Sequence, residues 1–157
     1  LVLSTLHTND AVSTIARLFD MGAAPFLVAA SLRGILAQRL VRRICESCAE
    51  PHTIDPGQRA ALRAELGERA DTLAFRRGRG CTYCNNTGYQ GRVGVYELVE
   101  MDDNLLAPLH AGDALAFAEA ARRQPGYQSL KRSAIELAAR GVTTMDQVMR
   151  VTFGLED

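Results

Sequence analysis

Four cysteines are the residues of this sequence whose type and spacing point most directly to chemistry. Cys45 and Cys48 form one C-x-x-C pair, Cys81 and Cys84 form another, and no cysteine is left over. The C-x-x-C spacing lets both thiolates of one turn reach the same metal ion, and two such pairs are typical of a four-cysteine zinc site. We therefore predict that these four side chains bind one structural Zn²⁺.

Other roles for the cysteines are open at this point. A single C-x-x-C pair would suit a redox protein, and four unpaired structural thiols would give the same composition. The stretch CTYCNNTG is also similar to the knuckles of chaperone-type zinc domains, which bind unfolded protein, although those domains need four repeats. The 157 residues carry 18 basic and 18 acidic side chains. Because nucleic-acid binding usually needs a basic excess, we predict no nucleic-acid partner.

A histidine near the start of the chain is the second candidate for chemistry. Residues 1–6, LVLSTL, predict a buried strand, His7 follows directly, and residues 8–10 offer helix-capping side chains. A histidine between a strand end and a helix N-terminus is placed to donate to a phosphate or to orient a water molecule. The same position also suits a capping or core histidine, and position alone favours that simpler role.

The remaining elements are predicted to be mostly helical. Apolar spacing indicates a helix from Ala11 to about Gly22, and Pro25 opens a second, largely buried helix that we expect to run to about Arg43. After the second cysteine pair, a Gly-rich turn precedes an alternating run that indicates a strand. Further helices are predicted at 56–66, 103–109, 113–122, 128–140 and 144–152.

Several segments together resemble the ATPases of type II secretion and type IV pilus assembly. The His box of that family is similar to STLHTNDA at 4–11. Its tetracysteine subdomain and exit strand are similar to AQRLVRRIC at 37–45 and to GCTYCNNTGYQGRVGVYEL at 80–98. Its C-terminal segment is similar to GVTTMDQVMRV at 141–151. The QPGY version at 124–127 resembles the branch that serves MSHA-type pili.

This resemblance implies an α/β fold, mostly helical here, that is the C-terminal half of a RecA-like P-loop ATPase domain. The implied parts are a piece of the RecA-like core with the His box (1–44), a tetracysteine zinc subdomain (45–84), a Gly-rich turn with a return strand (85–101) and a C-terminal helical region (102–157). The family's P-loop pattern, G-x-x-x-x-G-K-[ST], does not occur in residues 1–157. We therefore expect the chain to be a C-terminal fragment of a longer protein.

The resemblance also assigns roles to individual residues. It makes His7 a catalytic residue and Arg92 a contact to the nucleotide base, because an arginine plane can stack on or hydrogen-bond to an adenine edge. A structural ion pair of Arg92 would look the same in sequence. Four thiolates on one Zn²⁺ leave a net charge of −2, and flanking arginines would offset it, although each of them also suits a solvated surface. These arginines are Arg42, Arg43, Arg76, Arg77 and Arg79.

For the parent protein, the resemblance implies ATP hydrolysis with Mg²⁺ that powers pilus assembly or protein secretion. Its implied partners are the other subunits of a homohexameric ring and an inner-membrane platform protein of the same machine. Its implied location is the bacterial cytoplasm, peripheral to the inner membrane. Without a P-loop to hold the phosphates, the fragment alone is expected to be inactive.

Overall fold

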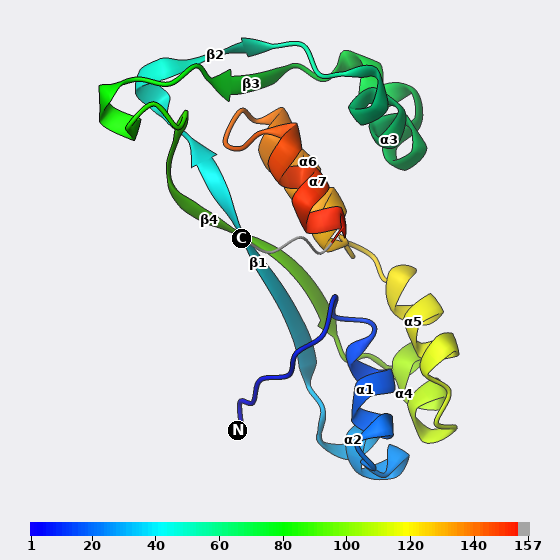
Figure 1. The fold of residues 1–157 in the computed structure, drawn as a ribbon. Coiled ribbons are helices and arrows are strands. Elements are labelled where there is room, and N and C mark those ends of the chain that lie inside the picture. The colour runs from blue at the N-terminus through cyan, green and yellow to red at the C-terminus, as the bar shows by residue number, and fades with distance from the viewer. Residues whose placement is uncertain (154–157) are drawn as a thin grey trace. The chain divides into compact units, whose positions relative to one another are not determined.

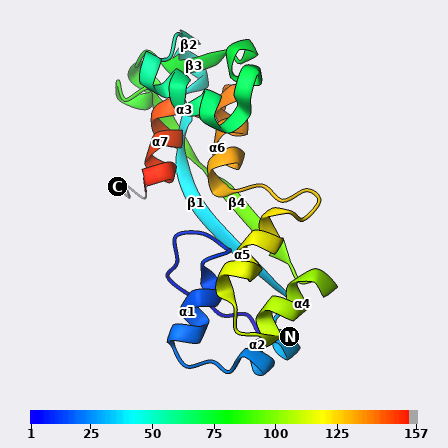
Figure 2. The same cartoon turned by 90° about the vertical axis from the view of Figure 1, so that its right-hand side faces the viewer.

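The computed structural model describes residues 1–153, and Figures 1 and 2 show the chain from two directions. Its internal contacts divide the chain into two compact units. The first unit comprises residues 1–38 and 96–129, and the second comprises residues 39–95 and the chain from Leu130 onward. No helix within the described residues has both the length and the apolar content that crossing a membrane requires.

The first unit contains four short helices. They are α1 (Thr14–Asp20), α2 (Pro25–Ser31), α4 (Asp103–His110) and α5 (Ala114–Arg122). Helix α2 packs against α4, and α5 packs against both α4 and α1, as Figure 2 shows. The largest apolar side chains that are fully buried in this unit belong to these helices and to the strand that precedes α4. They are Ile15, Val99, Leu105, Leu109 and Phe117.

Aspartates start the two helices that follow this strand. Gln124 Nε2 donates to one carboxylate oxygen of Asp102 at 2.8 Å, and the backbone N–H groups of Asn104 and Leu105 donate to the other. The hydrogen bond from Gln124 is the main reason that the pKa of Asp102 lies below its usual value, and the two backbone donors add to the effect. Asp113 accepts from Ala116 N–H at 2.9 Å. These caps satisfy N–H groups of the first helical turn, so both helices begin within one residue of their predicted starts.

The second unit combines helices with a short hairpin. Its helices are α3 (Pro56–Leu66), α6 (Leu130–Ala139) and α7 (Met145–Phe153), its hairpin strands are β2 (Ala49–His52) and β3 (Phe75–Gly78), and its 3₁₀ segments are η1 (Glu46–Cys48), η2 (Gly67–Thr72) and η3 (Thr82–Cys84). Helix α6 packs on α7 and contacts β3. The largest apolar side chains that are fully buried in this second unit are Val41, Leu62, Val95, Ile135 and Val148.

Two long strands, β1 (Gly34–Ile44) and β4 (Tyr89–Glu100), pair in a separate two-stranded sheet. Two of the three boundaries between the units fall within these strands, and the third lies directly before α6. Strand β4 confirms the strand that was predicted after the Gly-rich turn. Helices α3, α4, α5, α6 and α7 confirm the five later helix predictions to within two residues at each end.

The second predicted helix, from Pro25 to about Arg43, is wrong over most of its length. Helix α2 ends at Ser31, and residues 34–44 form strand β1 instead. Buried and exposed side chains alternate along much of β1, with Ile35 and Ala37 buried and Leu36 exposed between them. The run is apolar enough to suit either element, and pairing with β4 decides in favour of a strand.

The first predicted elements also differ from the structure. Residues 1–8 adopt no regular secondary structure, and Leu1, Val2 and Leu3 are almost fully exposed. A strand needs a neighbour to satisfy its backbone groups, and residues 1–6 pair with no strand among the described residues. The first helix begins at Thr14 rather than Ala11, because Asp10 Oδ1 accepts from Ser13 N–H at 2.8 Å in a turn that precedes it.

Candidate metal centre

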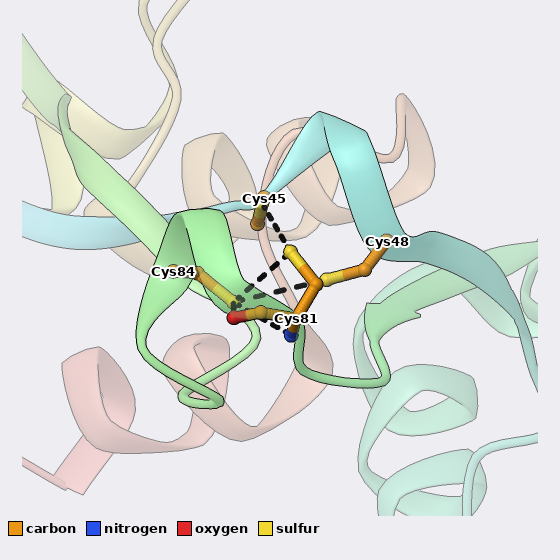
Figure 3. Close-up of side chains that lie close together, drawn as sticks. All are labelled: Cys45, Cys48, Cys81 and Cys84. Atoms are coloured by element: carbon orange, nitrogen blue, oxygen red, sulfur yellow. Dashed lines mark hydrogen bonds between the residues drawn. The ribbon is translucent and has the colours of Figure 1, made fainter.

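The four cysteines come together in the second unit with their sulfur atoms facing a common point (Figure 3). All four sulfurs lie within 4.8 Å of one another. The Sγ–Sγ distance is 3.8 Å between Cys45 and Cys81, 3.9 Å between Cys48 and Cys84, and 3.7 Å between Cys81 and Cys84. Three of the cysteines are buried, Cys81 is partly exposed, and all four are free thiols.

These distances match those of a tetrahedral metal site. A zinc ion with Zn–S bonds of about 2.3 Å places its four sulfurs about 3.8 Å apart. The arrangement therefore fits one ion such as Zn²⁺ bound by four thiolates. Such a set leaves no open coordination position for a water or a substrate, which is the pattern of a structural rather than a catalytic metal.

The β2–β3 hairpin brings the two cysteine pairs together. β2 begins directly after Cys48, β3 ends three residues before Cys81, and the antiparallel register pairs Ala49 with Gly78. Two further backbone hydrogen bonds join the turns: Arg79 N–H donates to Cys48 O at 3.0 Å, and Cys45 N–H donates to Gly88 O at 2.9 Å. Sequence spacing predicts the ligands, whereas this register is what places the two pairs side by side.

Two glycines allow the backbone to cross closely beside the cysteine turns. A Cβ atom added to Gly88 would lie 2.4 Å from the carbonyl oxygen of Gly78, and one added to Gly78 would lie 2.0 Å from that of Gly88. Gly88 also has a φ of +76°, which side chains other than glycine's rarely adopt. The Gly-rich segment was predicted only to bend, and this contact was not predicted. The signal for it was the glycine that lies three residues before Cys81, matched by another four residues after Cys84.

The C-terminal helices support the strand that leads into the first cysteine. Ile44 N–H donates to Val142 O at 2.9 Å, and Thr143 Oγ1 donates to Arg42 O at 2.7 Å. Arg42 N–H in turn donates to Gln147 Oε1 at 3.0 Å. The α6–α7 turn and the start of α7 therefore fix the end of β1 directly before Cys45. This gives the GVTT segment a structural role at the metal centre.

Backbone N–H groups lower the pKa of the Cys84 thiol. Burial alone would raise the pKa of Cys84, but N–H groups of Cys81 and Gly88 donate to its sulfur at 3.3 and 3.2 Å and lower the pKa to about 6. The pKa of Cys48 is raised instead, to about 12. Burial is the largest cause, the neighbouring sulfurs add to it, and a hydrogen bond from the Gly80 backbone partly opposes it. A bound cation would replace these protons, because a metal takes cysteine as the thiolate.

The flanking arginines make no hydrogen bond to the sulfurs among the described residues, and their offset of the thiolate charge stays a prediction. Arg43 pairs with Glu46 at 3.2 Å, and Arg77 pairs with Glu50 at 3.0 Å. The guanidinium of Arg42 stacks on the ring of Tyr89 at 4.5 Å. Backbone N–H groups, rather than guanidinium groups, therefore provide the polar contacts to the sulfurs.

His7 lies in the first unit, within the irregular residues 1–8, and its side chain is exposed. Helix α1 begins seven residues later, so His7 is not placed directly at a helix N-terminus as the sequence analysis expected. The Thr8 hydroxyl donates to Asp10 O at 3.1 Å and lies 3.0 Å from the Thr14 hydroxyl. These bonds order the turn that follows His7, and its catalytic role stays a prediction.

Arg92 lies in the second unit on β4, and its side chain is exposed. Within residues 1–153 its guanidinium forms no ion pair, so the structural ion pair considered as an alternative is not present in the described part of the chain. The proposed contact with a nucleotide base is not tested by this geometry and stays a prediction.

This chain is similar to proteins that are named as ATPases of type II secretion and of type IV pilus assembly. It is 41% identical over 154 residues to the type II secretion system ATPase E of Vibrio cholerae, and 42% identical over 152 residues to a type II secretion system protein E of Pseudomonas aeruginosa. It is 38% identical over 152 residues to the type IV pilus assembly ATPase PilB of Thermus thermophilus. Each alignment covers 97% of this chain but only 29%, 30% and 17% of the respective relatives.

The chain thus spans less than a third of the length of these relatives. The sequence model of the family described as "Type II/IV secretion system protein" matches residues 1–150, so this chain belongs to that family.

Proposed function

We propose that this chain is the C-terminal part of an ATPase that powers type IV pilus assembly or type II protein secretion. The observation that carries the proposal is the extent of the likeness, since nearly the whole chain aligns at about 40% identity with proteins named as such ATPases. The proposed fold of the whole domain is the RecA-like P-loop fold, of which residues 1–157 supply the C-terminal half. ATP and Mg²⁺ would bind only in the complete protein.

The metal centre has a structural role in this proposal, and the ion is Zn²⁺. Four thiolates at tetrahedral spacing support zinc over harder cations, which prefer oxygen ligands. Zinc would hold Cys45, Cys48, Cys81 and Cys84 together and so close the long excursion of residues 49–80. Its chemistry is that of a crosslink, and the ion takes no part in hydrolysis.

The catalytic proposal rests on His7, in the segment that resembles the family's His box. In the complete protein its imidazole would donate to the γ-phosphate or position the attacking water, and Arg92 would contact the adenine. The exposure of both side chains supports this assignment, because each is accessible to a ligand. We further propose a homohexameric ring on the cytoplasmic side of the inner membrane that acts on a platform protein and binds no nucleic acid.

The test is ATP turnover by the full-length protein that contains this chain. His7→Ala should lower turnover on the order of 100-fold with little change in nucleotide affinity, because the lost interaction acts mainly in the transition state. His110→Ala is the matched control, since His110 is exposed at the end of α4 and has no proposed catalytic role. A His7→Ala protein with a lower melting temperature and normal turnover per folded molecule would make His7 structural instead.

The chain of residues 1–157 provides a second arm of the experiment. Purified to remove contaminating ATPases, it should show no turnover, because it contains no P-loop. Turnover that persists through purification would contradict the proposed division of the active site.

A further inference from the structure

A pocket of about 400 Å³ lies beside the first cysteine turn and has no role in the function proposed above. Its walls come from the end of β1, the η1 turn, β3 and the loop between α6 and α7. Half of its lining residues are charged, namely Arg43, Glu46, Arg76 and Arg140. None of the cysteine sulfurs lines this pocket, so any ligand in it would be separate from the metal.

The charges of this pocket do not balance. Glu46 is the single carboxylate of its lining, and Arg43 already pairs with that carboxylate at 3.2 Å. Arg76 donates only to the neutral carbonyl oxygen of Ala49, at 3.2 Å. Within residues 1–153 the Arg140 guanidinium has no hydrogen-bond or ion-pair partner, and its backbone N–H alone is engaged, with Glu136 O. Two guanidinium groups therefore share one pocket without a counter-ion.

The backbone holds one of these two arginines in place. Arg76 stands on β3, where the register with β2 is fixed, and its side chain passes directly over Gly141. A Cβ atom at Gly141 would lie 2.9 Å from Arg76 Cδ, and the φ of +73° at this position also favours glycine. Because Gly141 follows Arg140, the same turn that admits the Arg76 side chain also carries the second guanidinium. Arg76 is thus held at the pocket before any ligand arrives, which lowers the entropy cost of binding, whereas the exposed Arg140 side chain would be ordered by the ligand.

We propose that this pocket binds the phosphate group of a small phosphorylated molecule. Guanidinium groups present paired N–H donors that match phosphate and carboxylate oxygens, so the ligand is an oxyanion. A carboxylate would neutralise one arginine, whereas a phosphate monoester carries between about −1.5 and −2 at pH 7 and offsets both. The volume of this pocket, about 400 Å³, lies within the range of pockets that bind small molecules rather than a bare ion. The pocket therefore has room for an organic group beside the phosphate.

The experiment measures phosphate binding by the full, zinc-loaded chain with isothermal titration calorimetry at low ionic strength and pH 7.5. The probes are inorganic phosphate and glycerol 3-phosphate. We expect saturable binding at one site per chain, and we expect Arg140→Gln or Arg76→Gln to weaken it about tenfold or more, the loss that one charge-assisted hydrogen bond represents. Arg140→Lys should restore part of the affinity, because it keeps the charge but loses the paired donors.

Arg77→Gln is the matched control, because it removes the same charge from the residue next to Arg76 without altering this pocket's lining. It should bind within about twofold of the wild type, and circular dichroism should show each variant folded. Equal weakening by Arg77→Gln would reduce the effect to general charge attraction and overturn the proposal. The proposal would also be overturned if neither probe bound at concentrations up to 10-fold above about 1 mM. Binding only to vesicles of phosphatidylglycerol would overturn it as well.

Discussion

Removal of the proposed zinc ion tests most directly how the second unit is held together. Cys81→Ser takes away the partly exposed ligand and should abolish tight zinc binding, since three thiolates and a hydroxyl form a much weaker set. Elemental analysis of the wild-type chain should give one zinc per chain, and the variant should give close to none. Thr82→Ser, in the same turn, leaves all four ligands in place and should retain the metal.

The size of the effect follows from the loop that the metal closes. Zinc would link the Cys45–Cys48 turn to the Cys81–Cys84 turn across residues 49–80, a loop of about 30 residues. A covalent crosslink over such a loop stabilises a folded chain by about 4 kcal/mol through the entropy of the unfolded state. For a chain of this size that corresponds to a fall in melting temperature of roughly 8–16 °C.

The assay is thermal unfolding with and without a chelator, combined with hydrogen exchange. A chelator should lower the melting temperature of the wild type to that of Cys81→Ser and should leave the variant unchanged, because the variant has no metal to lose. Exchange should accelerate first in β2, β3 and α3 of the second unit, while α4 and α5 of the first unit keep their protection. A wild-type chain that contains no metal, or one whose melting temperature is unchanged by the chelator, would refute the prediction that zinc stabilises this unit.

Three further predictions concern single contacts. Gly88→Ala should destabilise the chain by at least about 2 kcal/mol and weaken zinc binding, because the left-handed backbone and the contact with Gly78 O leave no room for a methyl group; normal unfolding in urea would contradict this. Tyr127→Phe should cost about 1–2 kcal/mol because the buried carboxylate of Glu97 loses a donor at 2.9 Å. Burial, and then the hydrogen bond to Glu97, raises the pKa of Tyr127. The stabilisation by the Tyr127 hydroxyl should therefore be complete below the ordinary tyrosine pKa near 10 and decline at higher pH. Urea unfolding of both proteins from pH 7 to 11 should show the difference in their free energies of unfolding shrinking only above pH 10. The pKa of Asp102 is lowered instead, so Asp102→Ala should reduce the melting temperature at neutral pH, and the difference from wild type should narrow below about pH 4; a constant difference down to pH 2 would exclude the carboxylate as its source.

The later helices illustrate what could be predicted from local sequence. Helix α3 starts at Pro56 because Asp55 accepts from Gln58 N–H while the Gln58 side chain accepts from Asp55 N–H, and every part of that capping box lies within four residues. Signals of this kind depend only on neighbours in the chain. The cysteine ligands were predictable for a similar reason, since metal chemistry fixes the spacing within each pair.

The strands illustrate what local sequence did not decide. Residues 34–44 are apolar enough for a helix, and only pairing with β4, far along the chain, makes them a strand. Residues 1–6 have strand-forming composition but lack a partner among the described residues. Strand formation depends on distant backbone groups, whose presence a local window cannot report.

The candidate sites were likewise predictable in part from local sequence and decided in part by the tertiary structure. Sequence alone identified Cys45, Cys48, Cys81 and Cys84 as one ligand set, because thiolate chemistry and spacing are local properties. The tertiary structure decided what surrounds them: the β2–β3 register, the crossing of Gly78 and Gly88, and the backbone N–H groups that donate to the Cys84 sulfur. It also gathered Arg76 and Arg140 into one pocket from distant segments. Contacts between residues that are distant in sequence depend on how the elements pack, and the local sequence around each residue does not indicate them.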